Sequence, residues 1–98
     1  MKDFEQQARI FKVLSAGTRV HIIELLKERS LCVNALARML EISPAAVSQH
    51  LRVLRDVGIV TADKKGYFVH YRMNEKTLAE WRRIAQELLE QKGAPDEC

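Results

Sequence analysis

The chain has 98 residues, of which 47% are hydrophobic and 30% are charged, a balance typical of one small globular domain. It contains no apolar run near the roughly 20 residues that cross a bilayer, and its N-terminus lacks the apolar core of a signal peptide. We therefore expect a cytoplasmic protein with no membrane partner, in which both cysteines are kept reduced.

The formal net charge of +3 is unevenly spread along the chain. Residues 1–43 carry seven Lys or Arg against five Asp or Glu (+2), residues 44–72 carry five against two (+3), and residues 73–98 carry four against six (−2). Neutralisation of phosphates supplies much of the affinity of proteins for nucleic acid. The basic middle segment therefore favours a DNA-facing side with a neutral or acidic back, although many ordinary domains have a similar overall charge.

Apolar residues at helical spacing predict four helices in the first part of the chain, over about residues 3–14, 18–29, 33–40 and 44–57. The start of the fourth helix is the best-defined boundary. Ser43 is a favourable N-cap, and Pro44 suits the first helical position. Gly58 can adopt the left-handed conformation that ends a helix.

A hairpin and a last helix follow. Residues 59–63 and 67–73 are predicted strands joined by a turn at Lys64-Lys65-Gly66. The capping-box pattern from Thr77 to Glu80 opens or reinforces a helix that runs to about Lys92. We expect one mainly α domain over residues 1–92, with five helices and a two-stranded wing, and a flexible tail over residues 93–98.

The last helix has a larger apolar face than so small a domain can easily cover, and we group the first helix with it. We therefore place them in a homodimer interface; the alternative is that the same side chains pack within one chain. The interface candidates are Phe4, Phe11, Leu78, Trp81, Ala85 and Leu88.

The fourth helix has two chemically different faces. Val47, Leu51 and Leu54 form an apolar stripe, whereas the opposite face is short, polar and cationic, as a helix needs to be if it is to enter the major groove of DNA. An ordinary solvated helix face is the competing interpretation. Together with the predicted wing, this face gives the DNA-binding candidates Ser43, Ala45, Ser48, Gln49, His50, Arg52, Arg55, Lys64 and Lys65.

These candidates have different expected roles. Gln49 can pair with adenine, and Arg52 with guanine or a phosphate. His50 lies near the edge of the apolar stripe, so a packing role and a phosphate contact are both open. Lys64 and Lys65 either contact the DNA backbone or minor groove, or simply keep the hairpin tip soluble.

Several motifs resemble the ArsR/SmtB family of transcriptional repressors. They are Leu14-Ser15-Ala16-Gly17-Thr18-Arg19, the third-helix run Leu31 to Ala37, the run Ser43 to Val60 with Ser48-Gln49-His50-Leu51, and Val69-His70-Tyr71-Arg72 in the hairpin. The resemblance covers residues 4 to about 90. It implies a winged helix-turn-helix homodimer that binds a palindromic operator on double-stranded DNA and releases it when an inducer arrives.

The chain departs from the metal-sensing pattern of this family. Thiol-using members carry Cys-Val-Cys at the start of the third helix, whereas this chain has Cys32-Val33-Asn34. Members that sense zinc through the last helix need histidines there, yet no histidine follows His70, so a zinc site on the C-terminal helix is not expected. One cysteine without further ligands is too few for a closed tetrahedral site.

The sequence therefore leaves the identity of the inducer open. A metal, a metalloid or a thiol-reactive signal that acts through Cys32 is one hypothesis, with Cys98 as a possible second thiol; a repressor with no metal inducer is another. Near a helix N-terminus the thiolate of Cys32 gains reactivity. Against this, a cysteine beside Leu31 and Val33 is often no more than a small buried hydrophobe.

Two other classes of function deserve comparison. A winged helix can serve as a protein-interaction module without specific DNA binding, and the sequence alone leaves that alternative open. An enzyme finds little support, because no nucleophile, base and orienting acid are spaced so that catalytic roles can be assigned, and no glycine-rich phosphate loop occurs.

Overall fold

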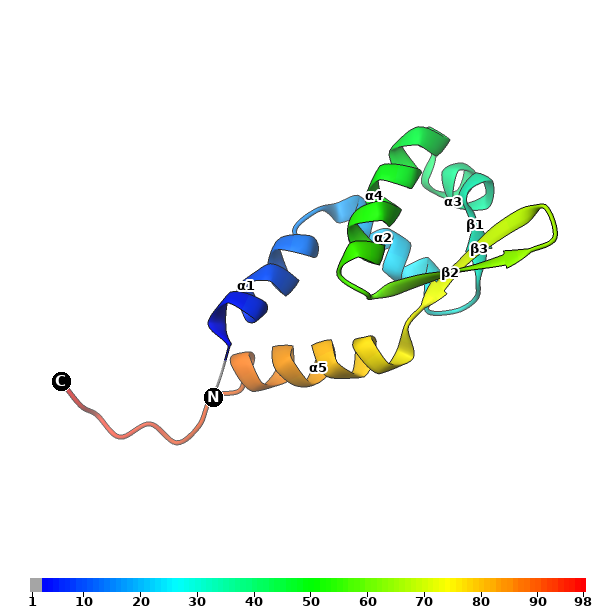
Figure 1. Ribbon diagram of the computed structural model, residues 1–98. Helices are drawn as coiled ribbons and strands as arrows, with labels where there is room; N and C mark the ends of the chain where they lie inside the picture. The colour runs from blue at the N-terminus through cyan, green and yellow to red at the C-terminus, as the bar shows by residue number, and fades with distance from the viewer. Residues whose placement is uncertain (1–2) are drawn as a thin grey trace.

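The computed structural model describes residues 3–98, which form five helices and a small sheet (Figure 1). In chain order the elements are α1 (Phe4–Val13), α2 (Gly17–Leu26), β1 (Leu31–Cys32), α3 (Val33–Leu40), α4 (Pro44–Asp56), β2 (Val60–Lys65), β3 (Phe68–Met73) and α5 (Glu75–Leu89). This is the architecture of a winged helix-turn-helix, as expected. No helix within residues 3–98 is long and apolar enough to cross a membrane.

The ends of α4 follow the predicted signals. The Ser43 hydroxyl accepts a hydrogen bond from the Ala46 amide at 3.1 Å, and Pro44 occupies the first helical position, where its missing N–H costs nothing. Gly58 takes a φ of +80° just after the helix, a conformation that side chains with a Cβ disfavour. The helix that carries most of the candidate site therefore has fixed ends on both sides.

The sheet differs from the expected two-stranded wing. It has three antiparallel strands in the order β1-β3-β2, because Leu31 pairs with Tyr71 and Cys32 with His70. The hairpin itself is longer than expected, since Lys64 and Lys65 belong to β2. The turn is thus a two-residue one between the paired Lys65 and Phe68. Gly66 takes a φ of +65° at its first central position, as a type II′ turn requires.

The last helix begins earlier than the capping box predicts. Asn74 is the N-cap, and its side-chain oxygen accepts from the Thr77 amide at 3.3 Å. Thr77 therefore lies inside the first turn rather than before it, so of the two predicted roles, opening or reinforcing the helix, the structure excludes opening. The helix ends at Leu89, and no regular secondary structure follows from residue 90 onward.

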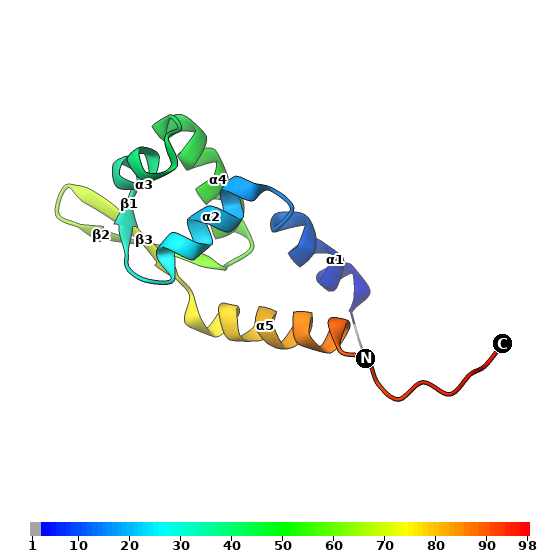
Figure 2. The same ribbon diagram turned by 180° about the vertical axis from the view of Figure 1, so that it is seen from behind.

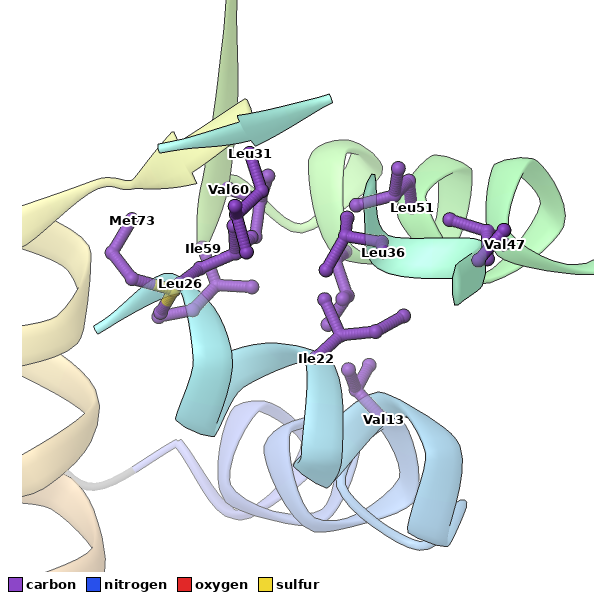
Figure 3. Close-up of a cluster of buried hydrophobic side chains, with 12 residues drawn as sticks. Val13, Ile22, Leu26, Leu31, Leu36, Val47, Leu51, Ile59, Val60 and Met73 are labelled. Carbon is purple, nitrogen blue, oxygen red and sulfur yellow. The ribbon is translucent and has the colours of Figure 1, made fainter. Parts of the chain in front are cut away.

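The core lies between α2, the α3–α4 pair and the inner face of the sheet (Figure 3). Seven large side chains are almost wholly buried there: Ile22, Leu36, Val47, Leu51, Leu54, Ile59 and Val60. The predicted apolar stripe of α4 supplies three of these seven. Its burial leaves the opposite face of α4 free to contact a partner.

Helices α1 and α5 lie side by side at the end of the molecule opposite the hairpin, in both views (Figures 1 and 2). The side chains of Gln6 on α1 and Glu80 on α5 are joined by a hydrogen bond of 3.3 Å. The described chain is elongated, with extents of 60 × 24 × 22 Å. The two candidate interfaces, for DNA and for a second copy, are thus spatially separate.

Candidate nucleic-acid interface

The outer face of α4 is exposed and carries the predicted polar and cationic side chains. Ala45, Ser48, Gln49, Arg52 and Arg55 are all exposed, whereas the stripe on the opposite side of the helix is buried. The face contains small residues at its N-terminal end and two arginines further along. Such a surface permits close approach to a groove and supplies donors for base edges and phosphates.

An open cleft of about 440 Å³ separates α4 from the hairpin. Two arginines and one acid contribute to it, so its walls are cationic on balance. Its lining residues are Ser48, Leu51, Arg52, Arg55, Asp56 and Tyr71. A phosphate that entered this cleft would meet the two guanidinium groups and the serine and tyrosine hydroxyls.

Tyr71 is a member of this cleft that sequence reasoning missed. A signal for it exists in the strand alternation, because residues 69, 71 and 73 of β3 share one face of the sheet. Met73 on that face is buried in the core, which places Tyr71 on the side of the helices. The cross-strand partner of Tyr71 on β2 is Ala62, whose small side chain leaves the ring room.

His50 lies on the flank of α4 and is partly buried beside Arg19 of α2. The Arg19 Nη1 lies 3.5 Å from His50 Nδ1, which is the outer limit of a hydrogen bond. The same guanidinium donates from Nε to the Val13 carbonyl at 2.6 Å. Of the two interpretations left open for His50, this geometry favours packing.

Ser43 and the two hairpin lysines lie at the margins of the candidate interface. The Ser43 hydroxyl caps α4, so the structure already gives it a role in folding. Lys64 and Lys65 are exposed near the end of β2, opposite Val69 and Phe68 respectively. Asp63, the acid beside them, is paired with Arg72 at 2.6 Å, which leaves the hairpin tip cationic.

Cys32 has a neighbour that the linear sequence does not reveal. It is partly buried, and His70 is its direct cross-strand partner, with Asp63 next in the same row. Residues paired in this way share one face of a sheet. Even so, within residues 3–98 no three His, Cys, Asp or Glu side chains converge as a metal site, so the residues present do not fit a closed metal centre.

Cys98 lies far from this row. It is exposed at the end of the C-terminal tail, which extends from α5 at the end of the molecule opposite the sheet (Figure 1). The structure therefore does not bring the two candidate thiols of one chain together.

The predicted dimer residues divide into two groups. Phe4 and Leu88 are 70% and 45% exposed on α1 and α5. Leu78 and Trp81 pack against the edge of the core, and with Ala85 they line a cavity of about 190 Å³ beside α1 and α2. Phe11 is partly buried on α1. Packing within the chain therefore covers part of this surface, and the rest faces solvent.

Sequence comparisons place the chain among regulators. A model of the arsR family of bacterial regulatory proteins matches residues 17–62. A cadmium resistance transcriptional regulatory protein CadC homolog of Staphylococcus aureus is 41% identical over 70 residues, which are 70% of this chain and 58% of that protein. The chain thus spans little more than half the length of that relative. An uncharacterised HTH-type transcriptional regulator of Methanocaldococcus jannaschii is 34% identical over 89 residues, covering 90% of this chain and all of the relative.

Solved structures agree with the sequence comparisons. A possible transcriptional regulator for arsenical resistance shares 36% identity and a TM-score of 0.75, over 82% of this chain and 83% of that one. The homodimeric winged helix-turn-helix DNA-binding domain of a possible ArsR-family regulator from Mycobacterium bovis has a TM-score of 0.71 and 28% identity, over 95% and 90% of the two chains. This family consists of regulatory proteins and not of enzymes. The chain belongs to the ArsR family of winged helix-turn-helix transcriptional regulators.

Proposed function

We propose that this chain works in the cytoplasm as a homodimeric transcriptional repressor that inserts α4 into the major groove of an operator. The observation that carries the proposal is the exposed polar face of α4, which adjoins a cationic cleft shared with the hairpin. Membership of a family of regulators supports the same function. An ordinary solvated face would need neither the cleft nor the neighbouring wing.

The contacts follow from the position of each side chain. Gln49 and Arg52 point outward from the middle of α4, where a groove-bound helix meets base edges: an adenine for Gln49, and a guanine or a phosphate for Arg52. Ser48 and Arg55 face the cleft with Tyr71, and these three hold the DNA backbone. Ser43 and Ala45 at the start of α4, and Lys64 and Lys65 on the hairpin, complete the interface.

The dimer forms through α1 and α5, with Phe4, Phe11, Leu78, Trp81, Ala85 and Leu88 at or beside the contact. The exposed apolar side chains on these helices support this, as does the homodimeric state of the related Mycobacterium bovis domain. Two-fold symmetry then places two copies of α4 in successive major grooves, roughly one helical turn of 34–36 Å apart. The operator is accordingly palindromic.

Release from the operator begins at Cys32. This thiol lies on β1, which pairs with β3 of the wing, so a modification there acts on the strand that carries Tyr71. A signal lowers affinity only if it favours the conformation that binds DNA poorly. Because the ligands around Cys32 do not form a closed metal site, the proposed signal is one that reacts with a single thiol.

Fluorescence anisotropy on the chain's own upstream DNA, with scrambled DNA as the control, tests this function. Specific binding is expected, and arsenite, cadmium and a thiol oxidant are then added separately. Release by one of them identifies the signal, whereas specific binding that ignores all three supports a repressor without such an inducer. Equal binding to both DNAs would contradict the proposal and favour a protein-interaction module.

A further inference from the structure

The tip of the hairpin carries an exposed apolar cluster. Tyr67 is fully exposed, Phe68 is 59% exposed and Val69 is 40% exposed, three consecutive residues that lie outside the buried core. Single exposed apolar residues are common on protein surfaces, but an adjacent group of this kind usually marks an interaction surface. We call residues 67–69 the wing-tip cluster.

The tip is held in a defined shape. Only Gly66 and Tyr67 lie between the paired strand ends, and the φ of +65° at Gly66 allows this tight type II′ turn. A two-residue turn between paired strands has few conformations, so an aromatic side chain placed there loses little entropy when it binds. The wing-tip cluster is therefore presented by a pre-formed element.

The charges beside the cluster restrict its partner. Lys65 is the cross-strand partner of Phe68, and Lys64 that of Val69. No acidic residue occurs from position 64 to position 69, and the nearest acid, Asp63, is already paired with Arg72. A partner that complements this tip has an apolar interior for the aromatic side chain and anionic edges for the two lysines. The minor groove of DNA has this form, with phosphates at its edges and sugar C–H groups along its walls.

One member of the cluster, Val69, continues the candidate DNA interface, whereas Phe68 lies on the opposite face of β3 with His70. Val69 shares a face of β3 with Tyr71, which lines the cleft together with Arg52 and Arg55 of α4. Both views show the hairpin projecting past α3, away from α1 and α5 (Figures 1 and 2). With α4 in a major groove, a projecting hairpin on the same side reaches the adjoining minor groove.

We propose that Tyr67, at the tip of the hairpin, forms an apolar wedge that enters the minor groove flanking the α4 site and gives the protein a preference for A·T pairs there. The inference rests on the proposed function. In the minor groove, guanine adds an amino group that A·T pairs lack, and this group blocks the entry of an aromatic ring. The wing tip therefore reads the shape and width of the flank, while the lysines bind its phosphates.

The test begins with a duplex selected from random sequence by the wild-type chain. Its flanks are then varied among A·T, G·C and inosine·C pairs, since inosine·C has the minor-groove pattern of A·T but the major-groove pattern of G·C. Wild type is expected to bind the A·T and inosine·C flanks alike and the G·C flank more weakly. Tyr67→Ala is expected to lose this discrimination and to bind the A·T flank about ten-fold more weakly, the effect of removing one buried aromatic side chain.

Salt dependence separates the wedge from the charges. Lys64→Ala is expected to lower the slope of log affinity against log salt by about one unit, the value for one phosphate contact. Tyr67→Ala is expected to leave the slope unchanged, and Tyr67→Phe to retain the flank preference. Because Tyr67 touches nothing in the core, Tyr67→Ala has no reason to unfold, and its circular dichroism spectrum checks this.

The outcomes distinguish the two proposals. If selection enriches no sequence, the DNA-binding function fails and the wedge fails with it. If wild type binds its selected duplex but Tyr67→Ala keeps the affinity and the flank preference, the wedge alone is wrong. In that case a protein partner becomes the better explanation for the exposed aromatic residues.

Discussion

Arg19 and His50 connect the first half of the domain to α4, with Nη1 of the arginine 3.5 Å from Nδ1 of the histidine. The same guanidinium donates to the Val13 carbonyl at 2.6 Å and lies 3.5 Å from the Lys12 carbonyl. Arg19 thereby satisfies the Val13 carbonyl at the C-terminal end of α1, whereas the Lys12 carbonyl already accepts from the Ser15 amide and hydroxyl. One side chain thus connects α1, a dimerisation candidate, to α4, the helix proposed to bind DNA.

Arg19→Ala is expected to destabilise the domain by about 1–2 kcal/mol, because the charged donor to the partly buried Val13 carbonyl is lost. Urea unfolding followed by circular dichroism measures this change. Arg83→Ala on the exposed side of α5 is the matched control, since its ion pair with Glu87 is solvent-exposed and worth little. Equal midpoints for the two variants would show that the Arg19 contacts contribute nothing measurable.

Ser43 and Ser48 provide a pair of substitutions that separate folding from DNA binding. Ser43→Ala removes the N-cap of α4 and is expected to cost about 1 kcal/mol of stability. Ser48→Ala, at an exposed position in the cleft, is expected to leave the unfolding midpoint unchanged and to weaken DNA binding. Thermal unfolding and DNA-binding anisotropy are measured on both variants. A destabilised Ser48→Ala that binds DNA normally, together with an equally stable Ser43→Ala, would contradict the prediction.

Arg52→Ala is expected to weaken specific DNA binding by about 1–3 kcal/mol, the range for loss of one bidentate base contact, and to relax specificity at one base pair. Because Arg52 is exposed and lacks an ion pair in the described residues 3–98, stability should not change. Binding to a set of single-base operator variants measures the effect. A uniform loss across all variants would instead assign Arg52 to a phosphate.

Leu88→Glu is expected to dissociate the dimer without unfolding the chain. Leu88 is 45% exposed, so a carboxylate there remains hydrated in the monomer but is buried without a partner in the proposed interface. Sedimentation velocity at several concentrations gives the oligomeric state. Gln86→Glu adds the same charge to another exposed position of α5 and serves as the control. If the Leu88→Glu variant remains dimeric, the dimer interface does not include Leu88.

Cys32→Ser is expected to retain operator binding and to lose release by whichever thiol-directed signal acts on wild type. Serine preserves the size of the side chain at this partly buried position but is not a comparable nucleophile. Anisotropy with and without the signal is the measurement. Cys98→Ser is the matched thiol control and should release normally, because the tail lies far from β1. Full release of Cys32→Ser would exclude this thiol as the sensor.

Local signals predicted α4 almost to the residue, because Ser43, Pro44 and Gly58 act through their own backbone geometry. At α5 they left the start of the helix undecided, because the Thr77 pattern could either open or reinforce a helix, and the N-cap proved to be Asn74, three residues upstream. The identity of the side chains alone does not decide which of two nearby candidate residues is the N-cap.

Strand β1 could not be predicted from the local sequence. It has two residues, and its partner on β3 lies far along the chain, so only the tertiary fold creates the pair. The same pairing brings His70 beside Cys32, whereas the linear sequence shows a cysteine with no histidine nearby. The cationic face of α4 was predictable from its helical period, but the Tyr71 contribution to the cleft depends on how the hairpin packs against α4.

The strand order β1-β3-β2 leaves β2 with one unpaired edge. Such an edge offers free backbone donors and acceptors to the hairpin of another molecule, and charged side chains are a common defence against this. Asp63, Lys64 and Lys65 occupy the outer half of β2. Two wings that met edge to edge would place these lysines together, so the charges disfavour pairing between hairpins and leave the hairpin free for the contact proposed above.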